Sequence, residues 1–271
     1  MTDNECSICI VSKGGFFMGR RSQTAICSGK KRRQGKRARR VRRQRRWLLG
    51  GLLILTVLFV RSVCQGVTEG ITAGRSRPVS LILQNPELPN GCEVTSMAMA
   101  LGAAGCPVDK LTLYSYLPRE SITERGGQRF GPDPEKAYAG DADELTGGWY
   151  CFEEPMIQAA DRWLDHCGSG LRARSVTGLS KTVLDRYARD QIPLVVWVTL
   201  DYASPQRSDF TWLLEDGTMY WPYRNLHCVV LTGAEGGQYW VADPLAGITQ
   251  VNQALFWDSF SAMGCRAVMI E

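Results

Sequence analysis

The feature that most constrains the fold is a cysteine at the start of a helical pattern, in the stretch LILQNPELPNGCEVTSMAMALGAAG at residues 81–105. From Val94 onward, apolar side chains recur at the i, i+3, i+4, i+7 spacing of one buried helical face. This spacing puts Cys92 in the first turn, after Asn90 as the expected N-cap and Gly91 as a point of tight turning. The pattern ends in a glycine-rich patch at 102–105, and Pro107 follows.

A thiol in the first turn of a helix lies near unpaired backbone N–H groups and the positive end of the helix dipole. Both favour the thiolate and can lower a cysteine pKa from about 8.5 to about 3.5–7.5. We therefore expect Cys92 to be an activated nucleophile. The competing interpretation is a small buried residue or half of a disulfide, which is the commoner role of a cysteine taken at random. Other features must decide between them.

Charge divides the chain into two opposed parts. Residues 1–61 hold 16 Lys and Arg against two acids, and twelve of those basic residues fall within 30–46. Of the 32 basic and 27 acidic residues in the whole chain, 16 and 25 remain from Ser62 onward, a net charge of −9. The basic run contains no aromatic residue to stack on bases, and it directly precedes an apolar segment. We therefore expect an orientation signal that stays in the cytoplasm, and no nucleic-acid partner.

The apolar segment that follows is a candidate membrane anchor. Residues 47–60 would span only about 21 Å as a helix, but 47–67 reach about 31 Å if Arg61 snorkels to the interface. A cleaved signal peptide is the alternative, although 46 residues before the apolar run exceed the usual total of about 15 to 30. We expect a disordered cytoplasmic tail at 1–46, a single-pass anchor in the lipid bilayer at 47–67, a linker at 68–79 and an extracellular domain at 80–271. Either alternative exports the acidic part.

Ten cysteines do not make one framework. Cys6 and Cys9 form a C-x2-C pair without a second pair at zinc-finger spacing, so we expect neither a metal site nor a cofactor. Seven cysteines follow the apolar run at 47–60. If Cys92 is a free nucleophile, the other six allow three disulfides in an oxidising exterior, or all six remain reduced. The pairing is left open.

The remaining periodicity gives the fold class. Helical spacing is found at 109–117, at 155–167 and after Ser180, whereas apolar runs typical of strands lie at 79–83, 192–200, 226–233 and 239–243. A long polar region at 119–148 has the composition of a functional or mobile loop. Helices come first and most strands later, which predicts an α+β fold with an antiparallel sheet.

A cysteine nucleophile needs a base, and the chain contains two histidines. His166 falls on the outer side of a helical pattern, which leaves His227 at the start of a strand. If Glu235 and Gly236 form the turn of the following hairpin, His227 faces Pro244 and its neighbour Asp243. Side chains on adjacent strands then stand within about 5–8 Å, so Asp243 can orient the imidazole. Asp243 would otherwise be an ordinary turn former at a strand end.

Gln84 lies eight residues before the nucleophile, at the end of the first strand pattern. Its side-chain amide, together with the backbone N–H of Cys92, would form an oxyanion hole. An ordinary polar residue at a strand end is the equally balanced alternative.

These motifs resemble the C39-like peptidases of the papain-like cysteine protease superfamily, in the single-domain branch of bacterial secreted and membrane-anchored proteins. Gln84 with LPNGCEVTSMAMAL is similar to the family's oxyanion glutamine and nucleophile helix, and HCVVLTG at 227–233 with DPL at 243–245 is similar to the base and its partner. GWYCF at 148–152 and IPLVVWV at 192–198 are weaker matches. The resemblance covers about 79–270 and implies a papain-like α+β fold, with the nucleophile helix packed on a C-terminal antiparallel sheet.

The resulting hypothesis is an exported, membrane-anchored cysteine peptidase. It hydrolyses amide bonds of a peptide or protein outside the membrane through Cys92, His227 and Asp243, with Gln84 as oxyanion donor. Two alternatives stay open. The same triad also suits an acyltransferase or a cell-wall amidase, because an amine can intercept the thioester. A non-catalytic surface module that keeps the fold is the other.

Overall fold

A computed structural model describes residues 78–271 of the chain. The predicted cytoplasmic tail, the predicted anchor and all but the last two residues of the predicted linker lie outside the described residues. Cys6, Cys9, Cys27 and Cys64 lie outside them as well. Within 78–271, no helix combines the length and the hydropathy needed to cross a bilayer.

The centre of the domain is a six-stranded sheet in the order β11-β10-β9-β6-β12-β5. Every neighbouring pair is antiparallel. All of β6 is buried, because helices cover both faces of the sheet at this strand, and this explains its uninterrupted apolar run. The strands are β5 (Ala173–Ser175), β6 (Leu194–Thr199), β9 (Leu226–Glu235), β10 (Gln238–Asp243), β11 (Gly247–Asn252) and β12 (Ala267–Ile270).

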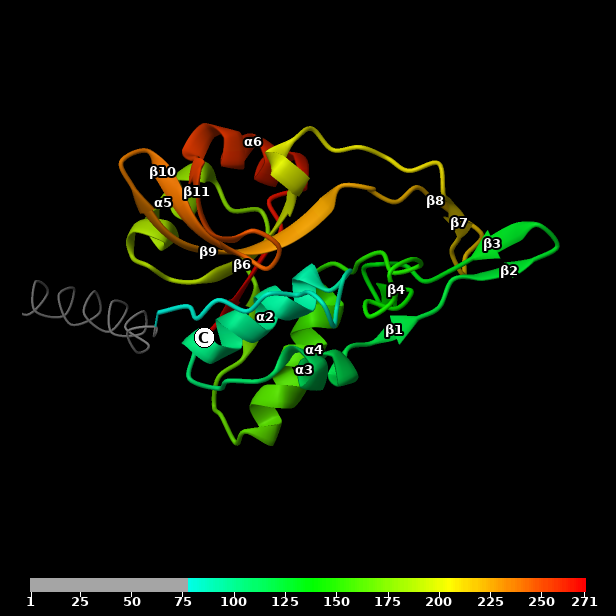
Figure 1. The fold of residues 1–271 in the computed structure, drawn as a ribbon, viewed down its shortest axis with the longest axis horizontal. Coiled ribbons are helices and arrows are strands. Elements are labelled where there is room, and N and C mark those ends of the chain that lie inside the picture. The colour runs from blue at the N-terminus through cyan, green and yellow to red at the C-terminus, as the bar shows by residue number, and fades with distance from the viewer. Residues whose placement is uncertain (1–77) are drawn as a thin grey trace, which may run out of the picture. The chain divides into compact units, whose positions relative to one another are not determined.

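Helices cover the two faces of the sheet and form two separate cores (Figure 1). On one face α2 packs on β9 and β6, and α4 packs behind it. On the other face α5 and α6 cover the second core. The helices are α2 (Cys92–Ala103), α3 (Lys110–Tyr116), α4 (Glu153–His166), α5 (Lys181–Arg189) and α6 (Gln253–Ala262). The predicted α+β fold, with the nucleophile helix on an antiparallel sheet, is confirmed.

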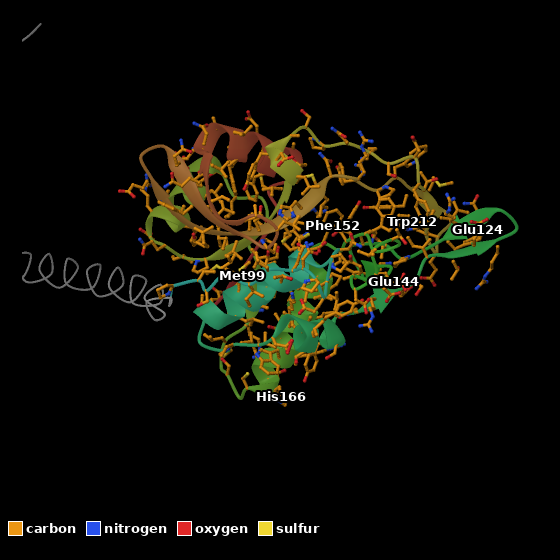
Figure 2. All side chains as sticks on the ribbon, viewed as in Figure 1. Met99, Glu124, Glu144, Phe152, His166 and Trp212 are labelled. Atoms are coloured by element: carbon orange, nitrogen blue, oxygen red, sulfur yellow. The ribbon has the colours of Figure 1, made fainter. Side chains whose placement is uncertain are left out.

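Two long polar regions, 119–148 and 201–224, pair with each other in a second, smaller sheet of order β2-β3-β7-β8. Phe130 of β3 pairs with Leu213 of β7, and the ring of Trp149 stacks on Phe210 at a centroid distance of 5.3 Å. Trp212 and Glu124 mark this region in Figure 2. The region 119–148, predicted as one loop, therefore contains four short strands: β1 (Arg119–Glu120), β2 (Thr123–Arg125), β3 (Gln128–Phe130) and β4 (Tyr138–Ala139). The region 201–224 contains β7 (Trp212–Leu213) and β8 (Met219–Tyr220).

Two local predictions were wrong. Residues 79–83 form no strand, since this stretch has no sheet partner before Gln84 donates its backbone N–H to the carbonyl of Pro244 at 2.9 Å. The β9–β10 turn is Gly236 and Gly237, both with positive φ, instead of Glu235 and Gly236. Glycine adopts this backbone without strain, and this favours the turn one residue later. A bulge between Trp240 and Val241 then shifts the register again.

Candidate active site

The nucleophile position begins α2 directly after a glycine. Gly91 is the N-cap and makes no side-chain capping bond. A Cβ at Gly91 would lie 2.6 Å from the Cβ of Leu88, so the close packing of this turn requires glycine. The predicted N-cap role of Asn90 is wrong. Its side chain donates to the carbonyl of Glu144 at 2.6 Å, which ties the turn to the loop before α4.

The side chain of Cys92 points into the protein. It is 9% exposed, and its sulfur donates to Oε2 of Glu93 at 3.3 Å. Burial raises the pKa of Cys92 well above its usual value, and the carboxylate of Glu93 raises it further. A hydrogen bond from the backbone N–H of Cys228 lowers this pKa only in part. The expected activation by the helix dipole is therefore wrong for this conformation, because desolvation and the neighbouring acid outweigh it.

Strand β9 is held against α2 at Cys228, the residue after the candidate base. Its carbonyl accepts a 3.0 Å hydrogen bond from Oγ of Ser96. Cys92 and Ser96 are one helical turn apart and lie on the same side of α2. This bond fixes β9 against the helix that Cys92 begins. Sequence reasoning missed Ser96, although its i+4 spacing from Cys92 was a usable signal.

His227 and Asp243 meet where β9 begins and β10 ends, in a cleft that residues of β11 and α6 also line. Nε2 of His227 lies 2.9 Å from Oδ1 of Asp243, and both residues are buried. Backbone N–H groups of Leu245 and Ala246 also donate to Oδ1, at 2.7 and 3.2 Å. Burial raises the pKa of Asp243, but the hydrogen bond from His227, the charge of that residue and the two backbone donors together lower it below the usual value.

The charge state of Asp243 fixes the tautomer of His227. A carboxylate can only accept, so Nε2 carries the hydrogen and Nδ1 is the nitrogen available as a base. The predicted register had brought these two residues together by a different pairing. In the structure β9 and β10 pair only as far as Val230 and Ala242, and Asp243 reaches His227 beyond the last paired residues.

Gln84 is buried next to the end of β10. Its Nε2 donates to the carbonyl of Pro89 at 2.6 Å, whereas its Oε1 is buried with no hydrogen-bond partner among the described residues. The backbone N–H of Gln84 bonds to Pro244, so the residue is anchored beside Asp243. One hydrogen of the amide is engaged with Pro89, and the second remains for another acceptor.

A cleft of about 350 Å³ opens on the side of His227 and Asp243. Its wall includes Tyr202 of the short 3-10 turn η1 (Leu200–Tyr202), whose buried hydroxyl has no partner among the described residues. Tyr202 has a φ of 56°, a left-handed conformation that is rare for a bulky residue. Cys92 does not line this cleft.

The second histidine is not part of the site. His166 lies exposed at the end of α4 and stacks on Trp163 at a centroid distance of 5.1 Å, away from the six-stranded sheet (Figure 2). Residues 78–271 contain no group of three or more His, Cys, Asp and Glu arranged to hold a metal ion. The six cysteines within this range are all free thiols in the structure.

A cysteine at a helix start and a hydrogen-bonded His–Asp pair, in an α+β fold, are the kinds of group that cysteine hydrolases use. The chain belongs to the Peptidase_C39 like family, whose sequence profile matches residues 77–268. The family resemblance drawn from the motifs is thereby confirmed.

Two similar proteins are bacterial. The uncharacterized protein YvpB of Bacillus subtilis (strain 168) is 29% identical over 203 residues, which cover 73% of this chain and 77% of that protein. A crystal structure from Bacillus anthracis, assigned to the C39-like peptidases, has a TM-score of 0.60 and 28% identity. It covers 70% of this chain and 92% of its own.

Proposed function

We propose that this chain is a cysteine peptidase that uses Cys92, His227 and Asp243. One observation carries the proposal: Ser96, in the helix that Cys92 begins, donates to the carbonyl of Cys228 at 3.0 Å, so the helix of the nucleophile is joined to the residue that follows the base. The bond from His227 to Asp243 supplies the tautomer that the chemistry needs. Membership of the C39-like family supports a peptide bond as the target.

The chemistry proceeds in two halves. Nδ1 of His227 takes the proton of the Cys92 thiol, and the thiolate attacks a peptide carbonyl. The backbone N–H of Cys92 and the remaining amide hydrogen of Gln84 stabilise the oxyanion. His227 then protonates the leaving amine, the C–N bond breaks, and a thioester forms. Water, deprotonated by His227, hydrolyses the thioester and restores the thiol.

The proposed location is the outer side of the cell membrane. The basic run at 30–46 followed by the apolar segment at 47–67 supports a single-pass anchor with its N-terminus in the cytoplasm. Intact cells that produce the full chain should lose the domain to an added protease. Protection of the domain in intact cells, with digestion after lysis, would contradict this topology.

The test of the activity is Cys92→Ala in the full chain. We expect hydrolysis of a mixed peptide library to fall by at least about 10³-fold, because the covalent intermediate can no longer form. Cys167→Ser is the matched control, since Cys167 is an exposed thiol at the far end of α4. Full turnover in Cys92→Ala would refute the proposal.

Product analysis separates hydrolysis from acyl transfer. With an amine acceptor added, a peptidase still yields mainly the free carboxylic acid, whereas a transferase yields a new amide. Hydrolysis of cell-wall crosslinks instead of peptides identifies an amidase. A chain that turns over none of these substrates behaves as a binding module.

A further inference from the structure

Glu93, the residue after the nucleophile, is a buried acid that the chemistry above does not use. It is 0% exposed. Its Oε2 accepts from the sulfur of Cys92 at 3.3 Å, and its Oε1 accepts from the backbone N–H of Cys151 at 3.2 Å. Its two oxygens thus join the start of α2 to the loop that precedes α4.

The surroundings of Glu93 offer no counter-charge. The titratable groups that act on it or feel its charge are Cys92 on its own helix, Cys151 before α4, Cys228 on β9 and Tyr138 on β4. Among the described residues, no Lys or Arg contributes to the environment of its carboxyl. Burying an acid without a cation is unfavourable, and an isosteric amide would fill the same space without that penalty. The acid therefore needs an explanation beyond packing.

The explanation lies in what a carboxylate does to a thiol at hydrogen-bond distance. A carboxylate accepts and cannot donate, so the thiol must keep its proton to make the contact. The contact also directs the sulfur toward the interior, where Cys92 does not line the cleft that holds His227 and Asp243. Both effects keep the nucleophile unreactive while it is in this conformation.

We propose that Glu93 is a positioning residue that holds Cys92 as a protonated, inward-pointing thiol until rotation about its Cα–Cβ bond brings the sulfur to His227. The second half rests on the proposed peptidase function, whereas the first half stands on the Glu93 contacts alone. In the rotated conformation the S–H proton passes to Nδ1 of His227, and the thiolate forms only there. The thiolate is the species that oxidants and electrophiles attack, so the resting thiol is protected.

The test measures alkylation of Cys92 by iodoacetamide in the full chain, with the modified residue identified by peptide mapping. In this reaction the thiolate sulfur displaces iodide, so the rate follows the thiolate fraction. Glu93→Gln keeps the shape and the acceptor for Cys151 but removes the charge and the thiol acceptor. At pH 7 we expect Cys92 in this variant to react about tenfold faster than in the wild type, the change that one pKa unit produces. The midpoint of the rate–pH curve should fall accordingly.

Glu154→Gln is the matched control, because Glu154 is the exposed acid next to buried Glu153 in α4 and its loss changes the net charge equally. Its Cys92 alkylation rate should match the wild type. A Glu93→Gln rate within twofold of the wild type, in a protein that unfolds cooperatively at a temperature no lower than the wild type, would overturn the proposal. If Glu93→Gln does not fold, Glu93→Asp moves the carboxylate away from the sulfur and should give a smaller increase in rate. An unchanged rate in Glu93→Asp would also overturn it.

The readout does not depend on peptidase activity. If Cys92→Ala keeps full turnover while Glu93→Gln speeds alkylation, the peptidase proposal fails and the Glu93 contact stands. If Cys92→Ala is inactive while Glu93→Gln alkylation is unchanged, the peptidase proposal stands and the Glu93 proposal fails.

Discussion

Two pairs lie at the candidate site: Asp243 with His227 is the first, and Glu93 with Cys92 is the second. The pKa of the acid is shifted in opposite directions in the two pairs. Asp243 accepts from His227 and from two backbone N–H groups, and its pKa is lowered although it is partly buried. Glu93 accepts from a thiol and one backbone N–H, and burial raises its pKa to about 7. The number and strength of the donors decide the difference, since both acids are removed from water.

The contrast assigns different tasks to the two acids. In the proposed mechanism, the charged Asp243 fixes which nitrogen of His227 acts as the base. The pKa of Glu93 is raised to about 7, and Glu93 faces a thiol whose pKa is also raised. In the same mechanism, the sulfur of Cys92 must leave Glu93 before His227 can take its proton.

Removing Asp243 should have the largest effect on catalysis. Asp243→Ala deletes the acceptor for Nε2 of His227, so the imidazole loses its preferred tautomer and orientation. We expect kcat/KM for a peptide substrate to fall by about 10²–10⁴-fold. Asp243→Asn should lose less, because its amide oxygen can still accept from Nε2–H.

The control for both variants is Asp185→Asn. Asp185 of α5 accepts from Lys181 and Tyr239, outside the cleft that holds Asp243, and its pKa is also lowered, although burial opposes this. Its loss should leave kcat/KM within about twofold of the wild type, as for changes remote from the reacting groups. Equal losses of kcat/KM in Asp243→Ala and Asp185→Asn would show that the contact between Asp243 and His227 is only structural.

Glu93 should make the unfolding free energy of the protein depend on pH. The pKa of Glu93 is raised from 4.5 to about 7 in the folded chain, so the unfolded chain releases this proton first. Stability is therefore lost as pH rises from about 4.5 to about 7, and below that window the penalty is absent. Glu93→Gln does not titrate. Its advantage in unfolding free energy over the wild type should grow by about 1–3 kcal/mol between pH 5 and pH 8.

Denaturant unfolding at the two pH values measures this change, and Glu153→Gln supplies the contrast. Glu153 is also buried, but it pairs with Arg266. Glu153→Gln removes one of the two carboxylates that pair with Arg266, the other being Glu135, and so should be less stable than the wild type at both pH values. If the difference in unfolding free energy between Glu93→Gln and the wild type is the same at pH 5 and pH 8, Glu93 does not titrate as described.

Local pattern was enough to predict much of the fold. The helix that starts at Cys92, the buried strand β6 and the acidic partner of His227 all follow from spacing and from the scarcity of histidines. β11 and α6 were not predicted. The register shift between β9 and β10 was not predictable either, because contacts across the sheet determine it.

The helix α2 shows where sequence reasoning stopped. Its pattern predicts one apolar face, yet eleven of its twelve residues are buried, including Glu93, Thr95 and Ser96. The helix dipole favours an acid in the first turn, where Glu93 lies. The sequence pattern does not indicate that this acid is buried, because the loop that covers it, at Cys151, is 58 residues away. The expected thiolate failed for the same reason, since a helix terminus activates a thiol only where water or a cation supports the charge.

The smallest expected effect concerns the hydrogen bond between Ser96 of α2 and Cys228 of β9. Ser96→Ala removes the 3.0 Å bond that holds Cys228 of β9 to α2. One lost buried hydrogen bond should lower the unfolding free energy by about 1 kcal/mol. Because this bond joins the helix that begins at Cys92 to the residue that follows His227, the variant should also lose up to about tenfold in kcat, with KM little changed, as expected when the proposed reacting groups are slightly misplaced.

Thr95→Val is the control for Ser96→Ala. The Thr95 hydroxyl is buried in the same helix, but it donates to the carbonyl of Gly91, which the Thr95 backbone N–H already satisfies. Its removal should affect stability without moving β9. A fall in kcat for Ser96→Ala but not for Thr95→Val means that the contact between α2 and β9 aligns the two pairs. Equal kcat values would mean that Ser96 serves only stability.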